Sequence, residues 1–294
     1  MLIPLRGIQR HPLARGRLFS VLRRFVFWQL RSRLHSSVDV PFVNQARLRV
    51  SRGMNGLTGN IYTGLHEFES MGFLLHLLRS DDLFVDVGAN AGSYTVLAGK
   101  AIGCRVVAVE PADAALHALH ANIALNDIAD RVEVHAVIAA DSEGTLPFTC
   151  DQGPENHVAW PSDPLPSTRS MPVQTLDRLL NGRVPCLIKL DVEGYELKAL
   201  RGASTTLAAP GLRALIVEIN GSESRYQLSA KELIAVLQRH GFSGYQYDPL
   251  RRSLHRIDPL SADGNVIFLR DSALIASLVA AAPAFSLPGW DLSI

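Results

Sequence analysis

One lysine and two acidic residues follow a hydrophobic run late in the chain, in a spacing that suits proton removal from a hydroxyl group. In "LIKLDVEG", Lys189 and Asp191 stand two residues apart, so they point to the same face of a strand predicted over 186–191. Asp191 is our first choice as base or substrate anchor. Lys189 either stabilises a developing alkoxide or neutralises Asp191 in a salt bridge. Glu193 follows at a predicted helix start, where capping the helix is its alternative role.

Two further oxygen-bearing side chains end a strand predicted over 214–219. Glu218 and Asn220, in "VEIN", share one face of that strand. Together with Asp191 they offer oxygen donors that suit Mg²⁺, and a bound cation would acidify a hydroxyl. We prefer direct hydrogen bonding to acceptor hydroxyls, because three donors of unknown geometry do not define a cation site. No metal ligand is therefore assigned.

A glycine-bearing turn forms a second candidate site. The stretch "DLFVDVGANAGSYTVLAGK", residues 82–100, predicts a buried strand, a turn and a helix, a unit that holds ligands in parallel sheets. The third glycine of a G-x-G-x-x-G dinucleotide turn is missing, and Asp86, two residues before Gly88, would repel a pyrophosphate. A ligand with an ammonium group and no phosphate fits better. S-adenosylmethionine has both features and a sulfonium cation.

The strand predicted over 105–110 supplies a partner for such a nucleoside. Glu110 ends this strand, where its carboxylate would accept hydrogen bonds from both ribose hydroxyls. Taken singly, Asp86 could cap its own turn and Glu110 could be a solvated strand end, but their joint spacing favours nucleoside binding. Asp141, in "IAAD", either reaches the adenine amine or is an exposed turn residue. The predicted cofactor site comprises Asp86, Gly88, Asn90, Gly92, Tyr94, Glu110, Asp141 and Asp191.

Residues 151–172 contain five prolines, and a long irregular stretch of this kind is usually functional or disordered. As a wall of the acceptor pocket the loop offers Asn156, His157 and the flat face of Trp160, which suits a sugar ring. His157 is a further candidate base, although an incidental surface histidine is the alternative. His66 and Glu67 precede the first predicted strand and would form a lid over the cofactor, unless they only begin a helix.

The composition describes a globular chain with one core. The 294 residues are 47% hydrophobic and show no repeat. The 29 basic and 28 acidic residues leave a net charge of +1, which gives no general attraction to nucleic acid. Three cysteines without CxxC spacing indicate neither a disulfide framework nor a zinc site, so a reducing compartment fits.

Strands and helices alternate from residue 83 onward, which predicts an α/β fold with helices on both faces of a sheet. Two late segments, "FSGYQYDP" and "NVIFLR", predict an added hairpin-like edge. The main strands are predicted at 83–88, 105–110, 132–138, 186–191 and 214–219.

The N-terminal segment, residues 1–35, carries eight arginines and no acidic residue. Arg23 and Arg24 interrupt what would be the apolar core of a signal peptide, and no apolar stretch approaches the ~20 residues that span a bilayer. We favour an amphipathic helix whose apolar stripe packs on the domain; contact with an anionic membrane surface is the second reading. The predicted stripe is Leu18, Val21, Leu22, Phe25 and Trp28.

Several of these motifs together resemble the FkbM family of S-adenosylmethionine-dependent methyltransferases. They are "FVDVGANAGSYT", "VAVEP", "VQTLDRLL", "LIVEINGS" and above all "LIKLDVEGYELKALRGA". The resemblance implies a Rossmann-like class I methyltransferase fold, with a mostly parallel seven-stranded sheet and an N-terminal helical extension. It places the methyltransferase domain at 56–275, the basic extension at 1–55 and a C-terminal tail at 276–294. Family members transfer methyl groups typically to oxygen on sugars or polyketide-type products.

The sequence therefore predicts an O-methyltransferase that acts by in-line transfer on a hydroxyl of a sugar, glycoconjugate or related natural product. A nucleotide-dependent oxidoreductase or epimerase and a non-catalytic cofactor-binding scaffold are the alternatives. Nucleic-acid methylation is disfavoured because "LDVEG" stands where a base-clamping Asn/Asp-Pro-Pro-aromatic motif would be. The expected location is the cytoplasm, either free or peripheral to the inner face of the membrane.

Overall fold

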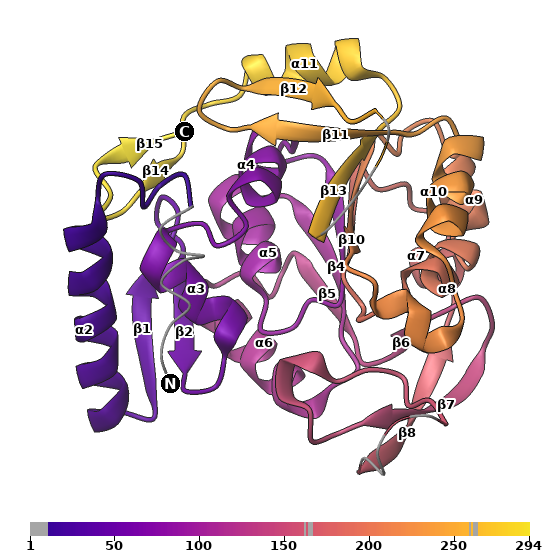
Figure 1. Cartoon of the computed structure of the whole chain (residues 1–294), viewed down its shortest axis with the longest axis horizontal. Helices are drawn as coiled ribbons and strands as arrows, with labels where there is room; N and C mark the ends of the chain where they lie inside the picture. Colours follow the sequence, from indigo (N-terminus) through magenta and orange to yellow (C-terminus); the bar gives the residue numbers. More distant parts are fainter. Residues whose placement is uncertain (1–10, 162, 164–166, 259, 261–263) are drawn as a thin grey trace.

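An eight-stranded mixed sheet runs through the centre of the molecule, and helices cover both of its faces (Figure 1). The structure is a computed structural model that describes residues 11–161, 163, 167–258, 260 and 264–294. Residues 1–10 of the predicted basic extension and residues 162 and 164–166 of the predicted proline-rich loop lie outside the described residues.

The strand order is β12-β11-β13-β10-β9-β3-β4-β5. The five strands from β10 to β5 pair in parallel, whereas β13 pairs antiparallel with both β10 and β11. Strands buried on both faces need mostly apolar sequences, and β3 and β9 are apolar apart from one charged residue each, Asp86 and Lys189. The bounds are β3 (Leu83–Val87), β4 (Arg105–Val109), β5 (Val132–His135), β9 (Leu187–Leu190), β10 (Ala214–Ile219), β11 (Ser243–Asp248), β12 (Ser253–Arg256) and β13 (Gly264–Leu269).

Each face of the sheet has its own apolar core. The first core is covered by α4 (Phe68–Leu77), α5 (Ser93–Val96), the π-helical η1 (Leu97–Ile102), α6 (Asp113–Leu125) and α11 (Ser272–Ala280). The second is covered by α7 (Leu176–Leu180), α8 (Glu196–Arg201), α9 (Ser204–Ala208) and α10 (Ala230–Arg239). The predicted α/β fold with a mostly parallel sheet and helices on both faces is confirmed.

The sheet differs from the prediction at both of its edges. β12 pairs with β11 and adds an eighth strand to the seven expected. The strand predicted over 132–138 divides into β5 and β6 (Ile138–Ala139), and β6 belongs to a separate small sheet with β7 (Gly144–Thr149) and β8 (Thr168–Gln174). Two short 3₁₀ helices, η2 (Gly153–Glu155) and η3 (Ser222–Tyr226), follow β7 and β10.

The N-terminal segment contains α2 (Leu18–Leu34), a hairpin of β1 (Ser37–Pro41) and β2 (Arg47–Ser51), and α3 (Asn55–Thr63). The inner side of α2 joins the first core through Val21 and Trp28, while Phe25 is half-buried. The predicted apolar stripe is nevertheless split, because Leu18 and Leu22 are exposed. None of the helices in the described ranges is long and apolar enough to traverse a bilayer.

Two buried asparagines, Asn122 of α6 and Asn126 directly after it, hold the hairpin against the domain. Asn126 Oδ1 accepts from the Arg47 backbone N–H and its Nδ2 donates to the Arg47 carbonyl, as a neighbouring strand would. Asn122 Oδ1 accepts from the Arg49 backbone N–H at 2.7 Å and its Nδ2 donates to the Ala91 carbonyl, in the glycine turn. These side chains form hydrogen bonds with the backbone groups on one edge of β2 and connect that strand to the candidate cofactor site.

The C-terminal residues close the same side of the molecule. β14 (Ser286–Leu287) and β15 (Leu292–Ser293) form a short hairpin beside the N-terminal segment (Figure 1). Arg24 of α2 donates to the carbonyls of Ile61 and Pro288, and its guanidinium lies 4.7 Å from the centre of the buried Trp290 ring. One arginine thus links α2, α3 and the C-terminal hairpin.

Because Trp28 is 4% exposed within the first core, Trp28→Ala should lower the free energy of unfolding by about 3–5 kcal/mol. Leu30→Ala, on the same helix but 57% exposed, is the matched control and should change it by less than ~0.5 kcal/mol. Denaturant unfolding of both variants measures the difference. Equal stabilities would mean that α2 does not belong to the cooperative core.

Candidate functional site

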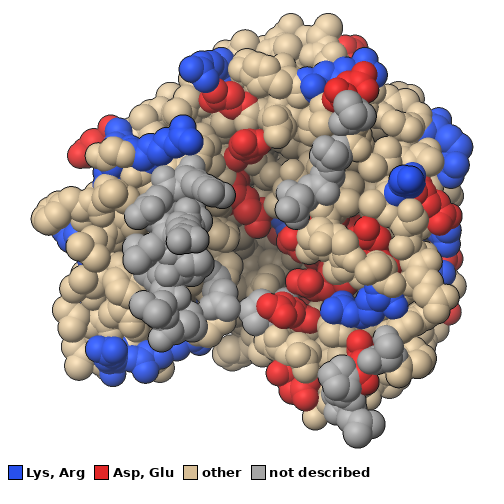
Figure 2. All heavy atoms as spheres, in the orientation of Figure 1, with Lys and Arg blue, Asp and Glu red and all other residues tan. Residues whose placement is uncertain are grey.

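The carboxyl ends of β3, β4, β9 and β10 open into one cleft of about 440 Å³, a size typical of small-molecule sites. Figure 2 shows it as a hollow with acidic surface along it, while basic surface lies mostly toward the periphery. Arg52 is the only basic residue among the described residues that line the cleft. The acidic lining residues are Glu110, Asp191, Glu193 and Glu218.

The glycine turn approaches the end of β9 too closely for any side chain. Gly88 has a φ of +79°, and a Cβ there would lie 1.7 Å from the Asp191 carbonyl oxygen. Both the conformation and the contact require glycine. The Gly88 and Ala89 N–H groups donate to the Val109 carbonyl, which joins the turn to the end of β4. The turn therefore forms a shared wall between the ends of three strands.

Glu110 is buried at the end of β4, and each of its carboxylate oxygens accepts one backbone hydrogen bond. Its Oε2 accepts from the Asn90 backbone N–H at 2.9 Å, and its Oε1 accepts from the Ala112 N–H at 2.8 Å. Burial raises the pKa of Glu110 to about 7, although the two backbone hydrogen bonds favour the ionised form. Each carboxylate oxygen retains capacity to accept a second hydrogen bond.

Asp86 lies beneath the turn, in a smaller pocket that shares Gly88 and Asp191 with the cleft. Thr95 Oγ1 donates to its Oδ2 at 2.7 Å, whereas its buried Oδ1 has no partner among the described residues. Burial raises the pKa of Asp86, and the nearby Lys189 ammonium opposes that shift. A buried acceptor without a donor is a place where a ligand's donor group is favourable.

Lys189 is the charged centre of this pocket. The register pairs it directly with Asp86 across β3 and β9, and its Nζ donates to Asp191 Oδ2 at 2.7 Å. The ammonium also lies 4.8 Å from the centre of the Tyr94 ring. Burial would lower the pKa of Lys189, but Asp191, Glu67 and Asp86 hold it well above its usual value. Lys189 is therefore a permanent cation.

Asp191 and Glu218 form a carboxyl pair on the same face of the sheet. Burial would raise the pKa of Asp191, but the Lys189 ammonium and hydrogen bonds from Lys189 and Glu218 lower it below its usual value. Burial and the charge of Asp191 raise the pKa of Glu218 to about 9. At neutral pH Asp191 is thus ionised, and Glu218 keeps a proton.

Glu193 stands at the mouth of the cleft on a left-handed backbone, with a φ of +54°. Such a conformation is uncommon outside glycine and often occurs at functional sites. Burial, followed by the charges of Asp191 and Glu155, raises the pKa of Glu193 to about 7. The buried Glu196, which sequence reasoning missed, accepts from the Val192 and Gly194 N–H groups and fixes this turn.

Three carboxylate oxygens, from Asp191, Glu193 and Glu218, lie within 4.8 Å of one another. The spacing suits a hard cation, which was an open alternative in the sequence. The net negative charge of these three groups is too small to favour a cation strongly, because Lys189 already neutralises Asp191 and Glu218 retains its proton at neutral pH. The same oxygens can instead accept from, or donate to, hydroxyl groups of an acceptor.

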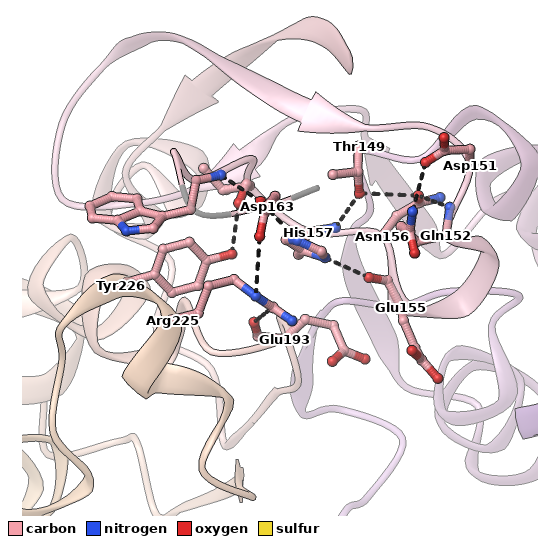
Figure 3. A network of polar contacts seen from close by, with 12 residues as sticks. Thr149, Asp151, Gln152, Glu155, Asn156, His157, Asp163, Glu193, Arg225 and Tyr226 are labelled. Atoms are coloured by element: carbon pink, nitrogen blue, oxygen red, sulfur yellow. Dashed lines mark hydrogen bonds and ion pairs between the residues drawn. The ribbon is translucent and has the colours of Figure 1, made fainter. Parts of the chain in front are cut away.

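The proline-rich loop contributes Asn156 to the cleft lining and holds His157 in a network behind it (Figure 3). His157 Nδ1 contacts the Glu155 carbonyl at 2.8 Å and its Nε2 contacts Asp163 Oδ2 at 3.3 Å. Asp163 also accepts from the Trp160 backbone N–H and lies 3.8 Å from Arg225. With both ring nitrogens engaged, the geometry favours a positioning role for His157.

Two aromatic contacts secure this loop from the side of η3. Tyr226 donates to the Val158 carbonyl at 2.9 Å, and its ring meets the Trp160 ring edge to face at 5.5 Å. Trp160 therefore packs on protein and does not line the cleft. Arg225 donates to the Glu193 carbonyl, so the loop network reaches the mouth of the cleft (Figure 3).

The other predicted residues divide between the two pockets and the surface. His66 and Glu67 line the smaller pocket, where Glu67 accepts from Tyr94 and Asn265. Asp141 forms an ion pair with Lys198 at 2.9 Å outside the cleft lining. Asn220 accepts from Ser222 and closes its own turn.

Because Lys189 is almost fully buried, Lys189→Ala should lower the free energy of unfolding at neutral pH by about 3–5 kcal/mol. The loss arises because Asp191 keeps its burial without its counter-charge, and adding Asp191→Asn should restore part of it. The exposed Arg178–Glu143 pair, also 2.7 Å long, is the matched control; Arg178→Ala should cost less than ~1 kcal/mol. Additive effects of the Lys189 and Asp191 changes in the double-variant cycle would contradict this coupling.

Two solved structures illustrate what this chain is similar to. Methyltransferase FkbM from Methylobacillus flagellatus KT has 20% identity and a TM-score of 0.44 over 84% of this chain, which spans 59% of that chain. An rRNA methylase from Streptococcus thermophilus has 17% identity and a TM-score of 0.39, covering 68% of this chain and 93% of that chain. Among curated proteins, none matches.

A family profile covers the glycine turn and most of the strand ends that line the two pockets. The FkbM methyltransferase domain matches residues 86–243, from Asp86 to the beginning of β11. The matched segment includes Glu110, Lys189, Asp191 and Glu218. Since it spans more than half of the 294 residues, this chain belongs to the FkbM family of methyltransferases.

Proposed function

We propose that this chain transfers the methyl group of S-adenosylmethionine to a hydroxyl of a sugar, glycoconjugate or related natural product. Membership of the FkbM family supports methyl transfer. The observation that carries the choice of a hydroxyl is the set of three carboxyl groups, Asp191, Glu193 and Glu218, whose oxygens lie within 4.8 Å at the strand ends. Groups of this kind hold hydroxyls by hydrogen bonds and remove their protons.

The residues around the glycine turn fit the proposed cofactor. The unpartnered Oδ1 of Asp86 would accept from the ammonium group, and Gly88 lets the turn lie directly against the Asp191 backbone at the end of β9. Glu110 would accept from the ribose hydroxyls with the lone pairs its backbone partners leave free. When bound, S-adenosylmethionine supplies an electrophilic methyl group on its sulfonium sulfur. The ion pair between the buried Lys189 and the partly exposed Asp191 would fix the charge at the bottom of this site.

Glu193 is the base we propose for the acceptor hydroxyl. A base works best when its pKa lies near the working pH, and the pKa of Glu193 is about 7. Asp191 has a lowered pKa and is the weaker base, so we assign it to anchoring the acceptor. Glu218 would donate its proton as a hydrogen bond to the bound molecule or to Asp191.

The charge of the cleft favours an uncharged acceptor rich in hydroxyl groups. Four acidic residues and one arginine line the cleft among the described residues, which would repel a phosphorylated or nucleic-acid acceptor. The pyrophosphate of a dinucleotide meets the same repulsion at Asp86, which disfavours the oxidoreductase and epimerase alternatives. A non-catalytic scaffold remains testable, because cofactor binding and methyl transfer depend on different residues here.

Binding of S-adenosylhomocysteine should strengthen as pH rises through about 7, since only ionised Glu110 accepts from both ribose hydroxyls. Below that pH the affinity should fall by up to ~10-fold per unit. Glu110→Gln should weaken binding by roughly 10- to 100-fold and remove this dependence. Calorimetry from about pH 5.5 to about pH 8.5, a range centred on that pKa, measures both effects.

Glu193→Gln is the control for this titration, because the pKa of Glu193 is also about 7 but Glu193 takes no part in the hydrogen bonds that hold Glu110. This variant should bind S-adenosylhomocysteine like the wild type and keep the pH dependence. An unchanged affinity in Glu110→Gln, or no binding by the wild-type chain, would reject the proposed cofactor site.

Labelled methyl groups should pass to hydroxyl-bearing acceptors in a screen of glycans, glycolipids and polyketide-type alcohols. Glu193→Gln should reduce kcat by about 100-fold or more, with cofactor affinity retained, because the variant lacks the base. His157→Asn, the matched loop variant, should act mainly on KM, because His157 positions the loop. Label recovered only on nitrogen, or loss of kcat in His157→Asn but not in Glu193→Gln, would overturn these assignments.

A further inference from the structure

The outer side of α2 carries a continuous apolar surface that the proposed reaction does not use. Leu18, Leu22, Val26, Leu30 and Leu34 recur every fourth residue, so they form one ridge along the helix. Phe19 and Phe27 flank the ridge. All seven side chains, here called the outer stripe, are between 46% and 82% exposed.

This clustering is not the ordinary scatter of apolar residues on a protein surface. Of the ten large hydrophobic residues that are exposed in the described part of the chain, seven belong to the outer stripe. The remaining three, Val184, Leu250 and Leu274, lie on other elements or loops. A contiguous exposed apolar patch of this kind marks a site of interaction with a protein or a membrane.

Arginines border the outer stripe, and no acidic residue occurs in α2. Arg23, Arg31 and Arg33 are exposed and form no ion pair within the described residues, and the Arg31 guanidinium stacks 5.2 Å from the Phe27 ring centre. Beyond the end of α2 a groove continues this basic surface. It is lined by Arg31, His35, Ser37, Val38, Asp39, Arg47 and Arg49, and Asp39 is already paired with Arg49.

The charges around the outer stripe indicate which kind of partner binds it. A second copy of α2 would bring two acid-free, arginine-bordered surfaces together without compensation. An anionic bilayer supplies an apolar interior for the leucines and phenylalanines and phosphate groups for the arginines. We propose that α2 docks this protein on an anionic membrane surface, lying in the plane of the interface with its outer stripe inserted.

The inner side of α2 keeps the rest of the chain in place during such docking. Val21 and Trp28 remain in the first core, and Arg24 holds α3 and the C-terminal hairpin. The outer stripe is already exposed, so insertion requires no unfolding. Seventeen helical residues extend about 25 Å, enough to lie along the interface but short of a bilayer span.

The test is co-sedimentation of the full chain with phosphatidylcholine vesicles, with and without phosphatidylglycerol. Wild type should partition at least ~25-fold more strongly onto the anionic vesicles. Arg23→Gln with Arg33→Gln should weaken that binding by roughly 25-fold, because each arginine near an anionic surface contributes about fivefold. Leu22→Glu with Leu30→Glu should weaken it by ~100-fold or more, through lost apolar burial and added repulsion.

Leu250→Glu with Leu274→Glu is the matched control, since these leucines are equally exposed but lie outside α2. It should bind vesicles like the wild type. All variants should retain S-adenosylhomocysteine affinity, and light scattering should show the same oligomeric state. Equal binding to neutral and anionic vesicles, or equal loss in the control, would overturn the proposal. A wild-type dimer that Leu22→Glu with Leu30→Glu dissociates would assign the stripe to self-association instead.

Discussion

The burial of a single ammonium group, that of Lys189, constrains the whole carboxyl edge of the sheet. An unpaired buried charge is very unfavourable, so the edge must supply anions at fixed places. The parallel register of β3 and β9 supplies Asp86, and the residue two beyond Lys189 supplies Asp191. Glu67, from the segment before α4, adds a third negative charge. Strand pairing and local sequence thus each supply a carboxylate to the same ammonium group.

The same cation divides the neighbouring carboxyl groups into different protonation states. Asp191, beside Lys189, stays ionised, while Glu218, one strand further on, keeps its proton. Glu193 lies at the mouth of the cleft and has an intermediate pKa of about 7. Three chemically similar side chains can therefore anchor, donate and accept a proton within one site. Their division of roles follows from distance to Lys189 and from burial.

Features that depend on one strand or turn were predictable from the sequence. Continuous apolar runs predicted β3, β4, β9 and β10, and period-two spacing placed Lys189 and Asp191 on one face. Features that depend on distant partners were not. Nothing local in "ENHV" indicates that His157 meets Asp163, and the buried Asn122 and Asn126 look like solvated helix residues until β2 lies against them. Glu196 carried a signal, a carboxylate in a first helical turn after a glycine, that can be recognised as a cap.

The net charge is only +1, but acidic and basic residues are concentrated in different parts of the protein. This separation of charge connects the proposed reaction with the proposed membrane docking. The charged residues that line the cleft are four acidic residues and one arginine, whereas α2 has arginines and no acid. Residues 52–54, between β2 and α3, and Gly56 of α3 line the cleft, and α2 packs against α3. An anionic surface would therefore attract the outer side of α2 and repel the cleft. On a membrane the cleft would face away from the headgroups, so an acceptor held there must extend clear of the phosphates, as the hydroxyl-rich end of a glycoconjugate does.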